Sequence, residues 1–171
     1  DRNKEIMEEE RKKAMAVEEA GVRKKIAAQL AYGRKYLDQG DPVQALERFK
    51  AVLEMDPAES EAKQLADTAR KKIEEGETVR NNLRALLEAW HNATKEPMTL
   101  KGIISLAPMN ESLKDALSEV ALDKGDISVR KLAYYMRQVR GRWEGNKHFE
   151  TSDKKIDGVV KWRVASSDRK S

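Results

Sequence analysis

Two helix breaks in the first third of the chain, at residues 40–42 and 56–57, restrict its fold more than any other feature. In Gly40-Asp41-Pro42, the aspartate is a good N-cap, and proline suits the first position of the helix that follows. Asp56 precedes Pro57 and is therefore disfavoured in the α region, so the second helix ends there. The sequence predicts a helical hairpin with a tight connection.

The hairpin carries small and aromatic residues at spacings of 3, 9, 4 and 8, ending in a proline: Gly33, Tyr36, Ala45, Phe49 and Pro57. This pattern resembles the tetratricopeptide repeat, a helical hairpin of about 34 residues that presents a surface to protein partners. The resemblance covers residues 26–59. It implies that Gly33 and Ala45 let two antiparallel helices approach closely. Tyr36 and Phe49 would fill the space beside that contact.

Only one such repeat is present, because no second copy follows at the same spacing. Residues 59–75 are predicted to form the helix that caps such arrays, with one small and apolar face: Ala62, Leu65, Ala66, Ala69 and Ile73. Gln29 replaces a residue that is usually large and apolar, and such repeats need about three copies to bury a core. We therefore expect further contact area from the preceding helix, the following domain, a second copy of the chain or a protein partner.

Residues 1–37 are predicted to form a long, highly charged helix exposed to solvent. Glu10 and Lys24 argue against a coiled coil, because they occupy the partner positions of a weak seven-residue pattern made by Met7, Ala14, Gly21 and Ala28. Gly76 is expected to end the helical region, with residues 77–82 as the junction to a second domain.

The composition excludes several classes of function. The chain has 171 residues and no cysteine, which excludes disulfides and cysteine-ligated zinc. His91 and His148 are too few for a histidine-based metal site, and no run approaches the roughly 18 apolar residues of a membrane span. Carboxylates alternate with basic residues, and the serines lack a neighbouring histidine, so we expect neither an enzyme nor a cofactor. We expect a cytoplasmic location, with the cell envelope as the alternative if a signal peptide was removed before Asp1.

Positive charge is concentrated in the C-terminal half. Residues 1–77 contain 16 Lys and Arg against 18 Asp and Glu, whereas residues 78–171 contain 18 against 12. Most of the excess lies in residues 124–163, with 11 basic and 5 acidic side chains. Such a block is typical of polyanion binding, although a solvated basic surface without a ligand has the same composition.

After residue 77 the pattern predicts several short helices, which begin near Leu83, Thr99, Asn110 and Ser128, the last ending at Gly141. Residues 147–151 and 159–164 are β-rich and predict a hairpin, followed by a disordered tail at residues 166–171. Helices followed by a basic helix and a basic hairpin have the order of a winged helix-turn-helix. We assign that domain to residues 78–165.

Five segments of this half resemble the winged-helix domain at the C-terminal end of primase-helicases and related proteins of phages, plasmids and integrated elements: RALLEAW, TLKGIISLA, ESLKDALSEVA, ISVRKLAYYMRQVRGR and VVKWRV. Gly141 and Gly145 match the glycines after that family's basic helix, and Trp162-Arg163 matches its Trp-Arg pair. The resemblance covers residues 83–164 and implies contact with DNA. It does not extend to ATPase activity, because the chain has no glycine-rich GKS or GKT loop.

The basic residues of this region form a candidate DNA-binding set, independently of that resemblance: Arg130, Lys131, Arg137, Arg140, Arg142, Lys147, Lys154 and Lys155. A helix with exposed arginines fits in or across a major groove, and lysines of a hairpin reach adjacent phosphates. Duplex DNA is the expected ligand, and its binding should depend steeply on salt. A winged helix that binds an acidic protein is the alternative.

Tryptophans and histidines have further candidate roles. Trp90 and Trp162 are predicted core residues. Trp143, beside Arg142 at the entrance to the hairpin, suits base stacking as well as a core position. His148 is a candidate phosphate contact.

Taken whole, the sequence predicts a mainly α protein with two domains. Residues 1–76 would carry one tetratricopeptide-type repeat between flanking helices, and residues 78–165 would form a small α+β winged helix-turn-helix. The predicted function is a non-enzymatic DNA-binding adaptor of a mobile-element replication or regulatory system, whose repeat region binds a protein partner or a second copy of the chain. The alternatives are a structural protein of a secretion or pilus-type assembly that binds only proteins, and a fusion of two unrelated segments.

Overall fold

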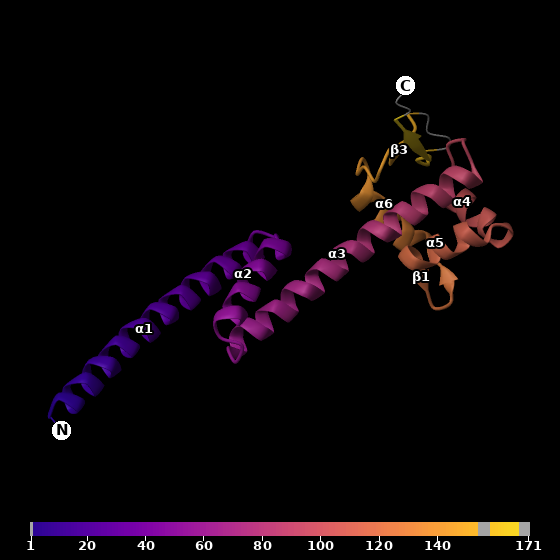
Figure 1. Ribbon diagram of the computed structural model, residues 1–171. Helices are drawn as coiled ribbons and strands as arrows, with labels where there is room; N and C mark the ends of the chain where they lie inside the picture. The colour runs from indigo at the N-terminus through magenta and orange to yellow at the C-terminus, as the bar shows by residue number, and fades with distance from the viewer. Residues whose placement is uncertain (1, 154–157, 168–171) are drawn as a thin grey trace. The chain divides into compact units, whose positions relative to one another are not determined.

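The computed structural model describes residues 2–153 and 158–167, which are mainly α-helical (Figure 1). The chain divides into two compact units, Asp1–Gly76 and Glu77–Ser171. Among the described helices, none is both long and apolar enough to cross a membrane.

The division between the units lies inside a helix, α3 (Ser60–Ala93). The expectation that Gly76 ends the helix, with a junction at residues 77–82, is therefore wrong. A glycine inside a helix costs only about 1 kcal/mol relative to alanine. Ala69 before it and Leu83 after it are buried in their own units, and this packing on both sides offsets the cost.

In the N-terminal unit, α1 (Arg2–Asp38) and α2 (Pro42–Met55) form the predicted hairpin. Asp41 caps α2, because its carboxylate accepts a hydrogen bond from the Gln44 N–H at 3.0 Å. Asp56 ends α2 in an extended conformation, as expected for a residue before proline. Both predicted helix breaks are confirmed.

The core of this unit consists of small and apolar residues from α1, α2 and the first part of α3: Leu30, Ala45, Phe49, Val52, Ala62, Ala66 and Ala69. Gly33 is buried and lies directly against the ring of Phe49. The alanines of α3 allow that helix to pack closely on the hairpin. An ion pair between Arg34 of α1 and Glu61 of α3 joins the two helices at the edge of this core.

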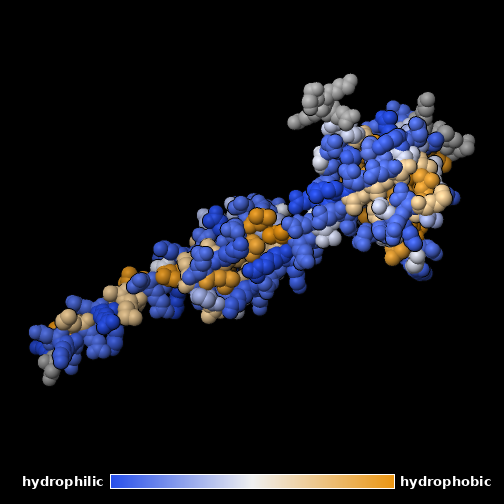
Figure 2. All heavy atoms as spheres, turned by 45° about the vertical axis from the view of Figure 1, so that its right-hand side comes forward, coloured by the Kyte–Doolittle hydropathy of each residue, from blue (hydrophilic) through white to orange (hydrophobic). Residues whose placement is uncertain are grey.

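The first half of α1 is exposed to solvent, as predicted. Every residue from Arg2 to Gly21 is exposed, and Figure 2 shows a mostly hydrophilic surface toward the start of the chain. Ion pairs one turn apart, Lys12–Glu8 and Lys13–Glu9, run along this part of the helix. Each contributes about 0.3–0.5 kcal/mol to helix stability.

The C-terminal unit contains the last part of α3, a 3-10 turn η1 (Ala107–Met109) and a series of short helices and strands: α4 (Leu100–Leu106), α5 (Glu111–Ala121), β1 (Leu122–Asp123), β2 (Asp126–Ile127), α6 (Val129–Val139), β3 (Lys147–Thr151) and β4 (Trp162–Ser166). Thr99, Asn110 and Ser128 cap α4, α5 and α6, since each side chain accepts a backbone N–H bond of 3.0 to 3.3 Å. The predicted starts of α4, α5 and α6 are therefore confirmed, whereas no helix begins near Leu83, which lies within α3. The strands β1 and β2 were not predicted, because two residues are too few to show an alternating pattern.

The strands β3 and β4 form an antiparallel pair in which Thr151 lies opposite Trp162. On the other edge of β4, Met98 pairs with Trp162 through two backbone hydrogen bonds of 2.9 and 2.8 Å. On the other edge of β3, the N–H of Gly141 donates to the carbonyl of Phe149 at 2.9 Å. These bonds hold the start of α4 and the end of α6 against the two strands.

The predicted tail begins too early. Ser166 belongs to β4 and pairs with Lys147 of β3, so strand pairing extends to that residue. Residues 168–171 lie outside the described part of the chain, as do residues 154–157, which include two of the candidate lysines of the hairpin.

The core of this unit gathers the end of α3, the short helices and the strands: Leu83, Leu86, Leu87, Trp90, Ile103, Leu113, Leu117, Leu132, Met136, Phe149 and Trp162. Trp90 packs edge-on against Phe149, with ring centroids 5.2 Å apart. Trp90 and Trp162 are buried, as predicted. The core thereby fixes which face of α6 points inward.

Candidate nucleic-acid interface

The helix α6 presents a buried apolar face and exposed basic faces. Leu132 and Met136 of its inner face have no exposed surface. Its outer faces and the residue after its end carry three exposed arginines, Arg130, Arg137 and Arg140. Within the described part of the chain, no carboxylate forms an ion pair with any of the three. Their positive charge is therefore directed to solvent without an acidic neighbour at contact distance.

Two of these arginines lie beside a residue that sequence reasoning missed. Arg137, Arg140 and Lys101 of α4 line one hollow of about 630 Å³. Its apolar walls come from α4, α6 and the strand region: Leu100, Val129, Ala133, Val159, Val160 and Trp162. Lys101 is brought here because Met98 pairs with Trp162 just before α4 begins. No local sequence pattern links Lys101 to α6, so only the tertiary structure shows that it adds a third positive charge to this hollow.

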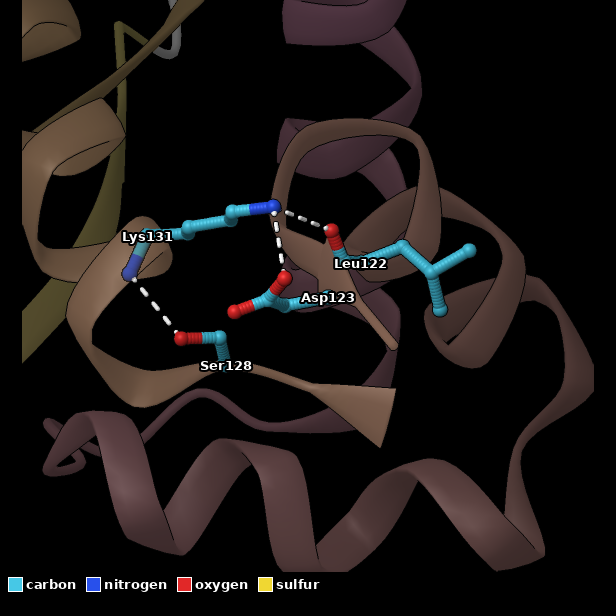
Figure 3. Close-up of polar contacts among 4 residues, drawn as sticks. All are labelled: Leu122, Asp123, Ser128 and Lys131. Carbon is cyan, nitrogen blue, oxygen red and sulfur yellow. Dashed lines mark hydrogen bonds and ion pairs between the residues drawn. The ribbon is translucent and has the colours of Figure 1, made fainter. Parts of the chain in front are cut away.

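Lys131, also predicted to contact DNA, is bonded within the protein (Figure 3). Its Nζ donates to the carbonyl oxygen of Leu122 at 2.9 Å and to the carboxylate of Asp123 at 3.1 Å. Its backbone N–H donates to the capping hydroxyl of Ser128. Lys131 thus joins α6 to the hairpin of β1 and β2, and its charge is balanced by Asp123.

Of the lysines predicted in the hairpin, Lys147 is described by the structure, and it forms an ion pair within the protein, unlike the exposed arginines of α6. The Nζ of Lys147 donates to Glu88 of α3 at 2.8 Å, and only 14% of its side chain is exposed. Lys147 therefore links β3 to α3 and is not presented to a ligand. Lys154 and Lys155 lie outside the described residues.

Arg142 lies beyond the end of α6, after a turn at Gly141, where φ is +71°. Burial raises the pKa of Tyr135 to about 12, and the positive charge of Arg142 opposes that rise. Arg142 itself is exposed and forms no ion pair with a described carboxylate.

Trp143 is 52% exposed, unlike the two tryptophans of the core. Its ring packs on the imidazole of His148, with centroids 4.0 Å apart and planes inclined by 42°. The Nε2 of His148 lies 3.5 Å from the carboxylate of Glu150, and only 16% of the His148 side chain is exposed. His148 thus supports Trp143 and faces a carboxylate, which does not suit the predicted phosphate contact.

The described residues contain no group of three or more His, Cys, Asp or Glu side chains that could hold a metal ion. Comparisons with known proteins found no matching family model, no matching curated protein and no matching solved structure.

Proposed function

We propose that the C-terminal unit binds duplex DNA through the outer faces of α6, and that the chain is a non-enzymatic DNA-binding adaptor. The observation that carries this proposal is the set of exposed arginines Arg130, Arg137 and Arg140, which lack carboxylate partners among the described residues. Unpaired cations on a rigid helix attract a phosphate backbone and need not break an ion pair to bind it.

The order of elements supports the same mode of binding. The helices α5 and α6 are joined by a short connection, and a two-stranded ribbon follows α6. In a winged helix-turn-helix this last helix lies in the major groove, and residues around it contact phosphates. If Arg137, Arg140 and Lys101 each neutralise one phosphate, log K for binding falls with log salt at a slope of about −2.7.

The resemblance to winged-helix domains of primase-helicases leads us to propose a role in a mobile-element replication or regulatory system. The enzyme activity of those proteins is not part of the proposal, since the nucleotide-binding loop is missing from the sequence.

The N-terminal unit supports the adaptor part of the proposal. The guanidinium of Arg48 lies 5.9 Å from the ring centroids of both Tyr32 and Tyr36, and Tyr32 is 55% exposed. The side chain of Gln29 accepts a hydrogen bond from Arg48 at 3.4 Å, which helps to orient the guanidinium. Tyrosine and arginine are enriched among residues that dominate protein interfaces. We propose that this surface binds a protein partner or a second copy of the chain.

A protein ligand for the C-terminal unit is the second candidate. Val129, Val159 and Val160 line the hollow beside α6 and are 38%, 49% and 37% exposed. Apolar walls with arginines beside them suit an acidic peptide that carries apolar side chains. In that case the chain would be a structural protein that binds only proteins.

The two candidates differ in their response to salt and to DNA. The test is fluorescence anisotropy of the whole chain with an unrelated labelled duplex at several salt concentrations. The double variant Arg137→Ala/Arg140→Ala should weaken binding and reduce the steepness of the salt dependence by about 1.8, or about 0.9 for each phosphate that is no longer neutralised. The control Arg2→Ala/Arg11→Ala removes the same charge from exposed positions of α1 and should leave the slope unchanged. No binding by the wild-type chain at low salt would overturn the DNA proposal in favour of a protein ligand.

A further inference from the structure

The indole of Trp143 is exposed to solvent, and the proposed duplex binding through α6 does not involve it. Trp143 is 52% exposed, whereas Trp90 and Trp162 are 0% and 6% exposed. Covering this exposed ring with a ligand would be favourable, because fully burying such a side chain is worth several times the thermal energy. Trp143 therefore offers an aromatic surface to a ligand just beyond the end of α6.

The turn that carries Trp143 is held in place on both sides. The Arg142 N–H donates to the Val139 carbonyl at 3.0 Å, and the Glu144 N–H donates to the Lys147 carbonyl at 2.9 Å. The carboxylate of Glu144 also forms an ion pair with Arg84 of α3 at 2.5 Å. The indole is thus oriented before any ligand arrives, which reduces the entropy cost of binding.

The surroundings of the indole fit an unpaired nucleobase. His148 packs against one part of the ring in a tilted arrangement, at a centroid distance of 4.0 Å, and leaves the exposed part of the indole open to a base. Arg142 precedes Trp143 and is exposed, with no ion pair to a described carboxylate. An aromatic platform beside a free cation is what proteins use to hold single strands, since the ring stacks on the base and the cation contacts the backbone.

We propose that Trp143 stacks on an unpaired base of single-stranded DNA and that the C-terminal unit prefers a duplex with a single-stranded extension to a blunt duplex. This inference rests on the proposed duplex binding by α6. The arginines of α6 hold the duplex part, and Trp143 with Arg142 holds the first unpaired nucleotides beyond it.

The test compares a blunt duplex with the same duplex carrying a 5′ or a 3′ thymidine extension, using the whole chain and fluorescence anisotropy. The wild-type chain should bind one of the extended duplexes about tenfold more tightly, which is within the range found for one stacked base. Trp143→Ala should abolish this preference and leave the affinity for the blunt duplex unchanged. Trp143→Phe keeps an aromatic face and should retain part of the preference.

Tryptophan emission gives a second, independent measurement. Trp90 and Trp162 are buried and Trp162 lies beside the duplex site, so the additional quenching by the extended duplex over the blunt duplex should report on Trp143 and should disappear in Trp143→Phe. Equal affinity of the wild-type chain for blunt and extended duplexes overturns the stacking proposal and leaves duplex binding intact. A preference that persists in Trp143→Ala also overturns it. Failure to bind either DNA overturns the proposed function and this inference together.

Discussion

Gly33 of α1 and Phe49 of α2 are in such close contact that a methyl group on Gly33 would come within 2.7 Å of the Cζ atom of the Phe49 ring. Phe49 has no exposed surface, so its ring has no free space into which it could move. The close approach of the two helices therefore requires that Gly33 has no side chain and that the Phe49 ring fills the space beside it.

Gly33→Ala should therefore destabilise the N-terminal unit, although alanine is the better helix former. Overpacking of a filled core costs roughly 1–3 kcal/mol, which exceeds the gain of about 1 kcal/mol from helix propensity. Gly21→Ala is the matched control, because nothing lies within 4 Å of the added methyl group. That variant should be slightly stabilised. Urea denaturation followed by circular dichroism measures both effects, and a Gly33→Ala chain as stable as Gly21→Ala would contradict this close packing.

The burial of Trp162 predicts a large effect on the C-terminal unit. The Trp162 side chain is only 6% exposed, so Trp162→Ala leaves a cavity in the core. The backbone pairing with Met98 holds residue 162 at the place where the sheet meets the core. We expect a loss of about 3–5 kcal/mol in the free energy of unfolding. Trp143→Ala removes a half-exposed ring and should cost less than about 1 kcal/mol. Thermal melts of the two variants would contradict this ranking if their midpoints were equal.

The contact between Lys131 and Asp123 predicts a gain of DNA affinity from the loss of an acidic residue. Asp123→Asn should release the charge of Lys131 and make the salt slope steeper by up to about 0.9. Protein stability should fall by no more than about 1 kcal/mol, because the pair is exposed to solvent. Adding Lys131→Ala to Asp123→Asn should return the slope to that of the wild-type chain. An Asp123→Asn slope equal to wild type would mean that Lys131 does not reach the DNA.

Tyr135 predicts a stability change at high pH. Its folded pKa, about 12, lies above the ordinary value of 10.0 because burial disfavours the phenolate. The folded state therefore keeps a proton that the unfolded chain loses, so stability is lost as the pH rises from about 10 toward 12. Since Tyr135 is only partly buried, we expect the loss to be roughly 1–2 kcal/mol.

The comparison with Tyr135→Phe isolates this effect from the titration of other groups. The phenol oxygen has no hydrogen-bond partner among the described residues, so the variant should be at least as stable as the wild-type chain at neutral pH. The difference in its favour should grow between pH 10 and 12. Parallel stability curves over that range would show that the Tyr135 phenol is accessible to water.

The parts of the fold that could be predicted are those that depend on residues close together in the sequence. Asp41, Thr99 and Ser128 cap their helices because a short polar side chain bonds to an N–H three residues ahead, and that spacing is visible in the sequence. At Gly76, by contrast, the neighbouring residues predicted the wrong structure. A glycine favours a helix end locally, but packing on both sides of it carries α3 through.

The candidate site was predictable only in part, for the same reason. The sequence shows that a helix is basic, but it does not show which basic side chains remain without a carboxylate partner in the folded protein. Lys147 is taken out of the set by Glu88, 59 residues away, and Lys101 is brought to Arg137 only by the folding of α4 onto the strands. The β1–β2 hairpin was also hidden, since its turn places Lys124 at a φ of 50°, a conformation that sequence reasoning assigns to glycine or asparagine.

The backbone bonds at the two edges of the ribbon have a consequence for how the C-terminal unit can associate. Met98 occupies the outer edge of β4 at Trp162, and Gly141 occupies the outer edge of β3 at Phe149. These bonds use the N–H and carbonyl of Trp162 and the carbonyl of Phe149, so those groups are not available to an incoming peptide strand. Strand-to-strand association is therefore blocked at Trp162 and Phe149, the two buried residues of this strand pair.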